Sequence, residues 1–210
     1  DGVVQTLFTG KAATGDEVAD GKGVAATFRE LRGIAVDMNG GIYVADRWCI
    51  RRISPDGTVT TIAGAKKFPN SSSSAIQDGR GADAEFYIPQ GVVFVPESNL
   101  IVLTDYDGNA RTVSADGQVT SFQAVPGKTW SNSGSHTYRM RLLDFARASS
   151  GELFALSDEG ILRLKPDMTH ETVWDWTMYA GGGAGISAPP VYSADLVGLD
   201  VLPDGRFVMV

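Results

Sequence analysis

Cysteine and histidine are nearly absent from this chain of 210 residues, which has one Cys and two His. The single thiol, Cys49, excludes an internal disulfide, and we expect it to be a packed, unreactive side chain. The two histidines, His136 and His170, cannot by themselves supply a three-histidine zinc site. No Ser-His-Asp spacing, Cys-His pair or Gly-rich phosphate loop emerges from the sequence. These absences disfavour the commonest kinds of catalytic site.

Positive charge and long apolar runs are also scarce. Lys and Arg total 18 against 25 Asp and Glu, a formal net charge of −7, which disfavours nucleic acid as a partner. One local exception is a cluster of basic residues: Arg47, Arg51, Arg52, Lys66 and Lys67. Because of this cluster, binding to single-stranded RNA is kept as a further hypothesis. No apolar run in this segment is long enough to cross a bilayer. The first residues lack the pattern of a signal peptide, and the compartment stays unknown.

The stretch from Gly33 to Gly64 contains four short β-rich runs. The runs are Gly33–Asp37, Ile42–Asp46, Ile50–Ser54 and Thr58–Ala63. Clusters of Gly, Asn, Asp and Pro separate them, which is the pattern of a four-stranded antiparallel sheet with tight turns. A sheet of this size buries little by itself, so the unit is expected to recur.

The unit does recur along the chain. Its first strand begins again near positions 33, 91, 144 and 198, at intervals of 58, 53 and 54 residues. A period near 50 with four strands per unit is typical of a β-propeller. We therefore expect an all-β fold and one domain over residues 1–210, with blade units at 33–63, 91–122, 144–174 and 198–210. Residues 1–7 are expected to form a terminal outer strand.

The last unit holds only two of the four expected strands. An open arc of blades leaves unpaired strand edges and bare apolar faces. We expect the propeller to be incomplete at the C-terminus, with the missing strands supplied by a longer chain or, alternatively, by another chain.

Several motifs resemble the NHL repeat, a propeller-blade motif. They are Gly-Ile-Ala-Val-Asp at 33–37, Gly-Ile-Tyr-Val-Ala-Asp at 41–46, Ile-Arg-Arg-Ile-Ser-Pro-Asp-Gly at 50–57 and Thr-Val-Thr-Thr-Ile-Ala-Gly at 58–64. The linkers 20–28 and 78–86, which begin Asp-Gly-Lys-Gly and Asp-Gly-Arg-Gly, are similar to the same family. The resemblance implies an NHL-type propeller with about four blades in this chain. Such scaffolds carry many unrelated functions.

Antiparallel strand order predicts two different faces. The turns after the first and third strands of each unit are short Pro, Asp, Asn and Gly turns, and we call their side the short-turn face. The loops after the second strand and the long connections between units form the loop-rich face, where propellers usually bind. Candidate partner-binding residues there are Arg47, Trp48, Tyr106, Asp107, Asn109, Trp130, His136 and Tyr138. The alternative is that these aromatic side chains only cover blade edges.

Residues 105–109 read Asp-Tyr-Asp-Gly-Asn and resemble part of a calcium loop, although the closing Glu is missing. A turn-capping role for Asp105 is sufficient, because Asp46 occupies the same position in the first unit. Asp46 with Arg51, and Asp105 with Arg111, are expected to form repeated structural pairs that brace the loops. We expect no cofactor and no metal, calcium being the one weak alternative.

The resemblance implies a non-catalytic scaffold that binds a protein, a peptide or a small ligand. The alternative is a metal-dependent propeller enzyme, similar to lactonases, hydrolases or an amidating lyase, whose site is completed by blades outside this chain.

Overall fold

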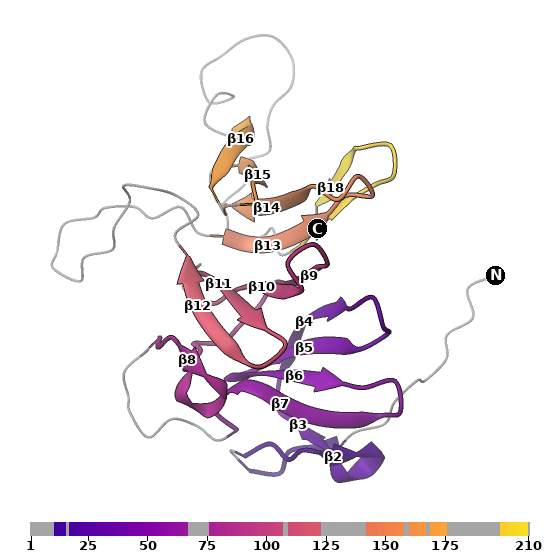
Figure 1. Ribbon diagram of the computed structural model, residues 1–210, viewed down its shortest axis with the longest axis vertical. Coiled ribbons are helices and arrows are strands. Elements are labelled where there is room, and N and C mark those ends of the chain that lie inside the picture. The colour runs from indigo at the N-terminus through magenta and orange to yellow at the C-terminus, as the bar shows by residue number, and fades with distance from the viewer. Residues whose placement is uncertain are drawn as a thin grey trace, which may run out of the picture.

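A computed structural model describes residues 11–15, 17–66, 76–106, 109–122, 142–157, 160–166, 169–175 and 198–209. Over these residues the fold is all-β, with two short 3-10 turns at Gly23–Ala25 and Gly81–Asp83. Figure 1 shows successive antiparallel sheets standing side by side in chain order, as propeller blades do.

The strands group into four blades. The first blade contains β4 (Leu31–Val36), β5 (Ile42–Asp46), β6 (Cys49–Ile53) and β7 (Thr58–Gly64). The second contains β9 (Val92–Val95), β10 (Leu100–Thr104), β11 (Ala110–Ser114) and β12 (Gln118–Phe122). The third contains β13 (Leu142–Arg147), β14 (Leu153–Ser157), β15 (Gly160–Leu164) and β16 (His170–Asp175). The fourth is represented by β17 (Leu199–Val201) and β18 (Phe207–Met209).

The four strands predicted in the first unit are all present, with ends that differ by two residues or fewer, and each further unit also contains strands. Three further strands, β2, β3 and β8, lie in segments that the sequence pattern treats as linkers. β2 (Gly21–Lys22) pairs with β7, and β8 (Gly79–Arg80) pairs with β12, so the first two blades have five strands. A short parallel pair joins β1 (Lys11–Ala12) to β3 (Thr27–Phe28). The outer strand expected at residues 1–7 lies outside the described residues.

Apolar side chains between neighbouring blades form the core. Between the first two blades, Tyr43 and Ala45 pack with Phe94 and Leu103, and the rings of Tyr43 and Phe94 stack with centroids 6.3 Å apart. Similar clusters lie between the second and third blades and between the third and fourth. Burying one such large side chain contributes roughly 1.5–3 kcal/mol. The repeated units therefore rest on one another, as the propeller interpretation requires.

Glycine allows the innermost strands of the first blades to approach closely. A Cβ atom on Gly33 would lie 1.9 Å from the carbonyl oxygen of Gln90, and one on Gly91 would lie 2.5 Å from Asp144 Oδ1. The third blade has Asp144 at the equivalent place, and its Oδ2 accepts a hydrogen bond from the Leu199 amide of the fourth blade at 3.0 Å. The first three blades thus use either close backbone contact or a carboxylate to fix the spacing to the next blade.

Candidate functional site

A fully buried arginine lies in the first blade, just below its loop-rich end. Arg51 on β6 donates to Asp46 Oδ2 and Asp20 Oδ1, both at 3.1 Å. It also donates to the carbonyl oxygens of Ala19 at 2.7 Å and Thr27 at 3.0 Å. Three of these four acceptors, in Ala19, Asp20 and Thr27, belong to the connection that leads into the first blade. Arg51 therefore fastens the incoming connection to the blade.

The second blade repeats this arrangement. Arg111 on β11 is fully buried and donates to Asp78 Oδ1 at 2.8 Å. It also donates to the carbonyl oxygens of Gln77 and Glu85, at 2.7 and 2.5 Å. Its guanidinium carbon lies 4.7 Å from the centre of the Phe86 ring. The buried Arg111 therefore holds the connection between the first two blades, as Arg51 holds the connection that leads into the first blade.

The carboxylates of both expected bracing pairs are buried, and the pairing of Asp105 with Arg111 stays a prediction. Asp46 is 1% exposed and pairs with Arg51, and it also accepts the backbone amides of Arg29 and Glu30 at 2.9 Å each. Asp105 is equally buried and accepts both the backbone and the side-chain amide of Asn109 at 3.0 Å. Both carboxylates stabilise the loops above them.

The sequence pattern missed two partners of the buried arginines, Asp20 and Asp78. Each lies 31 or 33 residues before the arginine it contacts. The available signal was the repeated Asp-Gly-Lys-Gly and Asp-Gly-Arg-Gly of the two linkers. An isolated Asp in such a linker is typical of an ordinary turn, so the sequence does not reveal its contact with an arginine on a distant strand.

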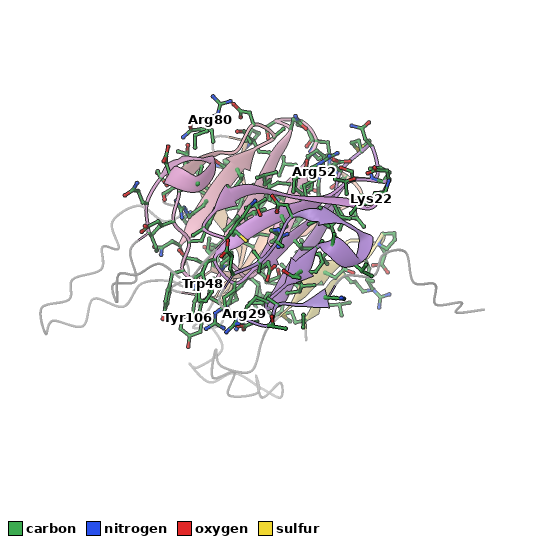
Figure 2. All side chains as sticks on the ribbon, turned by 90° about the horizontal axis from the view of Figure 1, so that it is seen from below. Lys22, Arg29, Trp48, Arg52, Arg80 and Tyr106 are labelled. Carbon is green, nitrogen blue, oxygen red and sulfur yellow. The ribbon has the colours of Figure 1, made fainter. Side chains whose placement is uncertain are left out.

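The loops fastened in this way expose an arginine and aromatic surface. Arg47 has a positive φ of 51°, and its guanidinium carbon lies 4.4 Å from the centre of the Trp48 ring, a cation–π contact. Trp48 itself is 6% exposed, so it supports the surface more than it presents it. Both Arg47 and Arg32 donate to the carboxylate of Glu30. Figure 2 shows Arg29, Trp48 and Tyr106 gathered on the same side of the molecule.

Tyr106 is the most exposed aromatic side chain of the described candidates, at 48%. It meets Tyr87 edge to face, with ring centroids 5.9 Å apart, and its backbone amide donates to the Tyr87 carbonyl at 3.0 Å. Ile88, next to Tyr87, has a positive φ of 50°. A backbone held in this uncommon conformation beside an exposed ring is typical of functional surfaces. We define the loop-rich surface as Arg29, Glu30, Arg32, Arg47, Trp48, Tyr87 and Tyr106.

The remaining candidates divide into two groups. Asn109 lies on the same loop as Tyr106, where it hydrogen-bonds to Asp105. The other candidates lie outside the described residues: Asp107, Trp130, His136 and Tyr138.

The basic cluster of the sequence does not form one surface, which corrects the observation behind the RNA hypothesis. Arg51 is fully buried, and Arg52 lies on the opposite side of the molecule from Trp48 and Tyr106 (Figure 2), where it pairs with Asp37 at 3.4 Å. Successive residues of a strand point to opposite faces of the sheet, so adjacent arginines separate. Lys67 lies outside the described residues.

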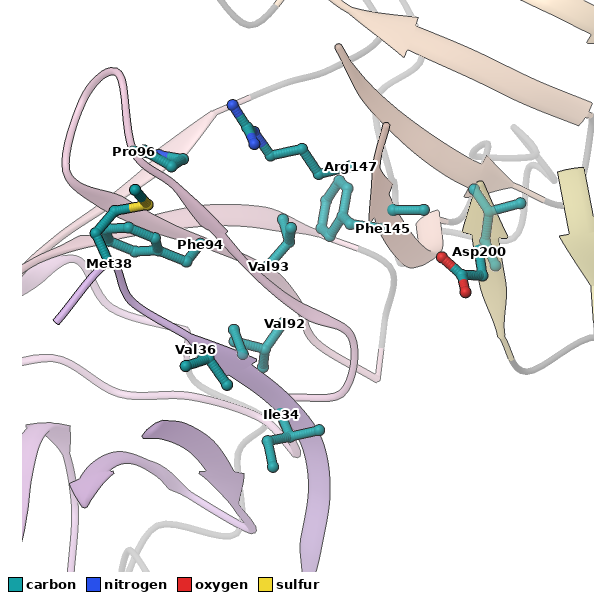
Figure 3. A pocket seen from close by; sticks show the side chains of 13 residues that line it. Ile34, Val36, Met38, Val92, Val93, Phe94, Pro96, Phe145, Arg147 and Asp200 are labelled. Atoms are coloured by element: carbon teal, nitrogen blue, oxygen red, sulfur yellow. The ribbon is translucent and has the colours of Figure 1, made fainter. Parts of the chain in front are cut away.

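The inner strands of the blades surround a hollow of about 350 Å³. Figure 3 shows the side chains that line it, and most of the lining residues are of apolar type, although polar atoms make up the larger part of the exposed surface: Ile34, Ala35, Val36, Met38, Val92, Val93, Phe94, Pro96, Phe145, Ala146 and Leu199. The charged lining residues are Arg147, which pairs with Glu97, and Asp200.

Burial raises the pKa values of one thiol and one carboxyl group. Burial raises the pKa of Cys49 to about 12, so the thiol stays protonated at neutral pH, and it donates to the Asp46 carbonyl at 3.3 Å. Burial also raises the pKa of Asp144. Within the described residues no three or more His, Cys, Asp or Glu side chains are grouped in a way that could hold a metal ion.

Residues 7–79 match the model of the Teneurin NHL domain. The extracellular domain of a suggested one-component system from B. thetaiotaomicron is similar in structure, with a TM-score of 0.54 and 12% identity over 100% of this chain and 27% of that chain. A protein suggested to be a gluconolactonase has a TM-score of 0.50 and 12% identity, over 95% of this chain and 66% of that one. A third solved structure, YCF48 bound to D1 peptide, has a TM-score of 0.43 and 16% identity, over 89% and 49%.

No curated protein matches the sequence. At these identities the first two structural likenesses show the propeller fold alone. The chain spans less than two thirds of the length of each of these solved structures. Together with the match to the Teneurin NHL domain, they confirm the NHL-type resemblance of the repeats.

Proposed function

We propose that this chain, whose NHL-type repeats fold into propeller blades, is a non-catalytic scaffold that binds a protein or peptide partner through its loop-rich surface. The observation that carries the proposal is the exposed Tyr106 ring set against Tyr87 on loops that buried side chains hold in place. Tyrosine and arginine are the residue types that most often anchor interfaces.

Preorganisation supports the same conclusion. Arg51 and Arg111 fix the connections that end at Arg29 and Tyr87, and Asp46 accepts the backbone amides of Arg29 and Glu30. A loop that is already ordered loses less conformational entropy when a partner binds. The buried polar network therefore makes an exposed loop surface better suited to binding.

A selection of peptides from a random display library tests this proposal. Peptides selected on the wild-type chain are expected to bind the Tyr106→Ala variant at least tenfold more weakly, because the central ring of the surface is lost. The matched control is Met38→Ala, which removes a side chain that is 77% exposed on the short-turn face. Equal binding to the wild type and Tyr106→Ala, or loss of binding in Met38→Ala, would contradict the proposal, the latter pointing to the central hollow.

The alternative is a metal-dependent propeller enzyme whose site is completed by blades outside this chain. One observation favours it: Asp144 is partly buried near the start of an inner strand and has a raised pKa, which is common for catalytic carboxylates. The described residues do not form a metal site, so no reaction step is assigned to them. Hydrolysis of a simple lactone that requires added Ca²⁺ or Zn²⁺ and is lost in Asp144→Asn would favour this alternative.

The structure adds one finding about membranes. None of its described helical segments has the length and apolarity needed to span a bilayer.

A further inference from the structure

The outer edges of the first two blades are closed by short strands of the chain itself. β2 pairs antiparallel with the start of β7, and β8 pairs antiparallel with the start of β12. Each short strand directly follows the aspartate that contacts the buried arginine of its blade, Asp20 in the first and Asp78 in the second. An extended segment with an Asp-Gly sequence therefore completes each of these edges.

The same two aspartates also bind a hydroxyl-bearing residue of the outer strand. Asp20 Oδ1 accepts the Thr61 hydroxyl at 2.8 Å. Asp78 accepts the backbone amide and the hydroxyl of Ser121, both at 2.8 Å. Hydrogen bonds to an ionised carboxylate are stronger than those between neutral groups. Backbone pairing and a carboxylate together hold the edge segment in place.

The third blade keeps the hydroxyl-bearing residue but changes its surroundings. Thr172 of β16 lies opposite Leu162, which takes the position of the buried arginines. Thr172 has the register of Thr61 and Ser121, so its amide is directed to the outer edge as theirs are. Residues 123–141, which connect the second and third blades, contain no Asp or Glu. This connection therefore cannot supply the carboxylate that the first two blades use.

In the part of the chain that the structure describes, β16 is the last strand of its sheet. Figure 1 shows it on the outside of the third blade. Val173 is 39% and Trp174 44% exposed. The adjacent Glu171 points to the other face of the sheet, where it pairs with Arg163 at 2.7 Å, so its charge is directed away from Thr172. An edge strand with exposed apolar side chains is a template for pairing with another segment.

We infer that the outer edge of the third blade is a second binding site, which takes an extended segment with an Asp-Gly sequence from a partner protein. The segment pairs antiparallel with the start of β16, as β2 and β8 do with the outer strands of their blades. Its Asp accepts the amide and the hydroxyl of Thr172. Addition of an extended peptide to a sheet edge is a common mode of recognition. The site is separate from the loop-rich surface and does not rest on the proposed function.

Fluorescence anisotropy with a labelled peptide tests the inference. The probe is Ile-Gln-Asp-Gly-Arg-Gly-Ala, the sequence of residues 76–82, and its counterpart has Ala in place of Asp. We expect the probe to bind at concentrations up to about 1 mM. The counterpart is expected to bind about tenfold more weakly, because the hydrogen bonds to an ionised carboxylate are lost.

A pair of threonine variants gives the sharper test. Thr172→Val keeps the branched shape and removes the hydroxyl, and it is expected to weaken binding of the probe about fivefold. The matched control is Thr61→Val, which makes the same change in the first blade, where Asp20 already occupies the edge. This control is expected to leave binding unchanged. Hydrogen–deuterium exchange with the bound probe is expected to show protection at residues 170–174.

Several results would overturn the inference. Equal binding of the probe and its counterpart would remove the role of the carboxylate. Protection at 58–61 or 118–121, or equal weakening in the two threonine variants, would show that the probe exchanges into edges that are already closed. Absence of binding up to the stated concentration would show that the edge does not take a peptide. Dimerisation of the chain without the probe, lost in Thr172→Val, would assign the edge to a second copy instead.

Discussion

The two faces of the molecule are stabilised in different ways. On the short-turn face, tight turns close their own backbone hydrogen bonds, as Gly57 does to Ser54 and Gly117 to Ser114, and the ion pairs are exposed. On the loop-rich face, longer connections depend on buried Arg51 and Arg111. Short hairpins need no buried charge, whereas long loops in a fixed conformation need partners for their backbone groups. The buried polar network therefore lies at the face whose long loops are held in one conformation.

The largest expected effect comes from removing the arginine of the first blade. Arg51→Met leaves the Asp46 carboxylate buried without its guanidinium, so the free energy of unfolding is expected to fall by about 3–5 kcal/mol in urea denaturation. Arg52→Met is the control, because it changes a neighbouring arginine that is about one-third exposed, and it is expected to cost about 1 kcal/mol or less. Equal losses of unfolding free energy in the two variants would contradict the claim that the two faces are stabilised differently.

The equivalent change in the second blade is expected to cost less. Arg111→Met leaves the carbonyls of Gln77 and Glu85 without this donor, but the side chain of Asp78 is 44% exposed and can be hydrated. We expect a loss of about 2–3 kcal/mol, measured in the same way. A loss greater than that of Arg51→Met would show that the burial of the paired carboxylate does not decide which of the two substitutions costs more stability.

A pH effect of opposite sign separates Asp144 from Asp78. Burial raises the pKa of Asp144, so the folded state holds the proton more tightly, and stability is lost as pH rises above about 3.8 and through the folded pKa. Burial also acts to raise the pKa of Asp78, but hydrogen bonds from Ser121 and Arg111 outweigh it and lower the pKa; its contribution is present above about pH 3.8 and lost below.

Asp144→Asn should therefore be at least as stable as the wild type at pH 7, because Asn can still accept the Leu199 amide. Thermal unfolding from pH 3 to 7 measures this. Lower stability at pH 7 would contradict the role given to burial.

The smallest effect is expected on the short-turn face. Arg80→Gln breaks an exposed pair with Asp116, and exposed pairs contribute little in water. Its unfolding midpoint is expected to match that of the wild type within experimental error. A clear loss would mean that the short-turn face also depends on its ion pairs.

The strands of the fold were predictable because their turns are marked in the sequence. Repeated Asp-Gly pairs and alternating apolar residues located the blades, whereas β2 and β8, each of two residues, carry no periodic signal. The bracing role of the arginines was predictable only in outline, since Asp20 and Asp78 contact them across long stretches of chain.

The third blade shows why the repeat alone does not predict the site. At the position of Arg51 it has Leu162, which is 1% exposed and packs in the apolar cluster between the second and third blades. At the position of Asp46 it has Ser157, whose hydroxyl donates to the Gly160 carbonyl at 2.8 Å and accepts the Gly160 amide at 3.0 Å. The blade keeps the fold but replaces the ionic fastening with a local turn. The repeat alone therefore does not predict which blades use a buried arginine to hold the connection that precedes them.

Hydrogen–deuterium exchange with and without a library peptide selected on the wild-type chain tests the binding face most directly. Protection is predicted at residues 29–32, 46–48, 87–88 and 105–106, with no change at the turns 38–41, 55–57 and 115–117. Protection confined to those turns, or to the inner strands around the central hollow, would contradict the assignment of the loop-rich surface as the binding face.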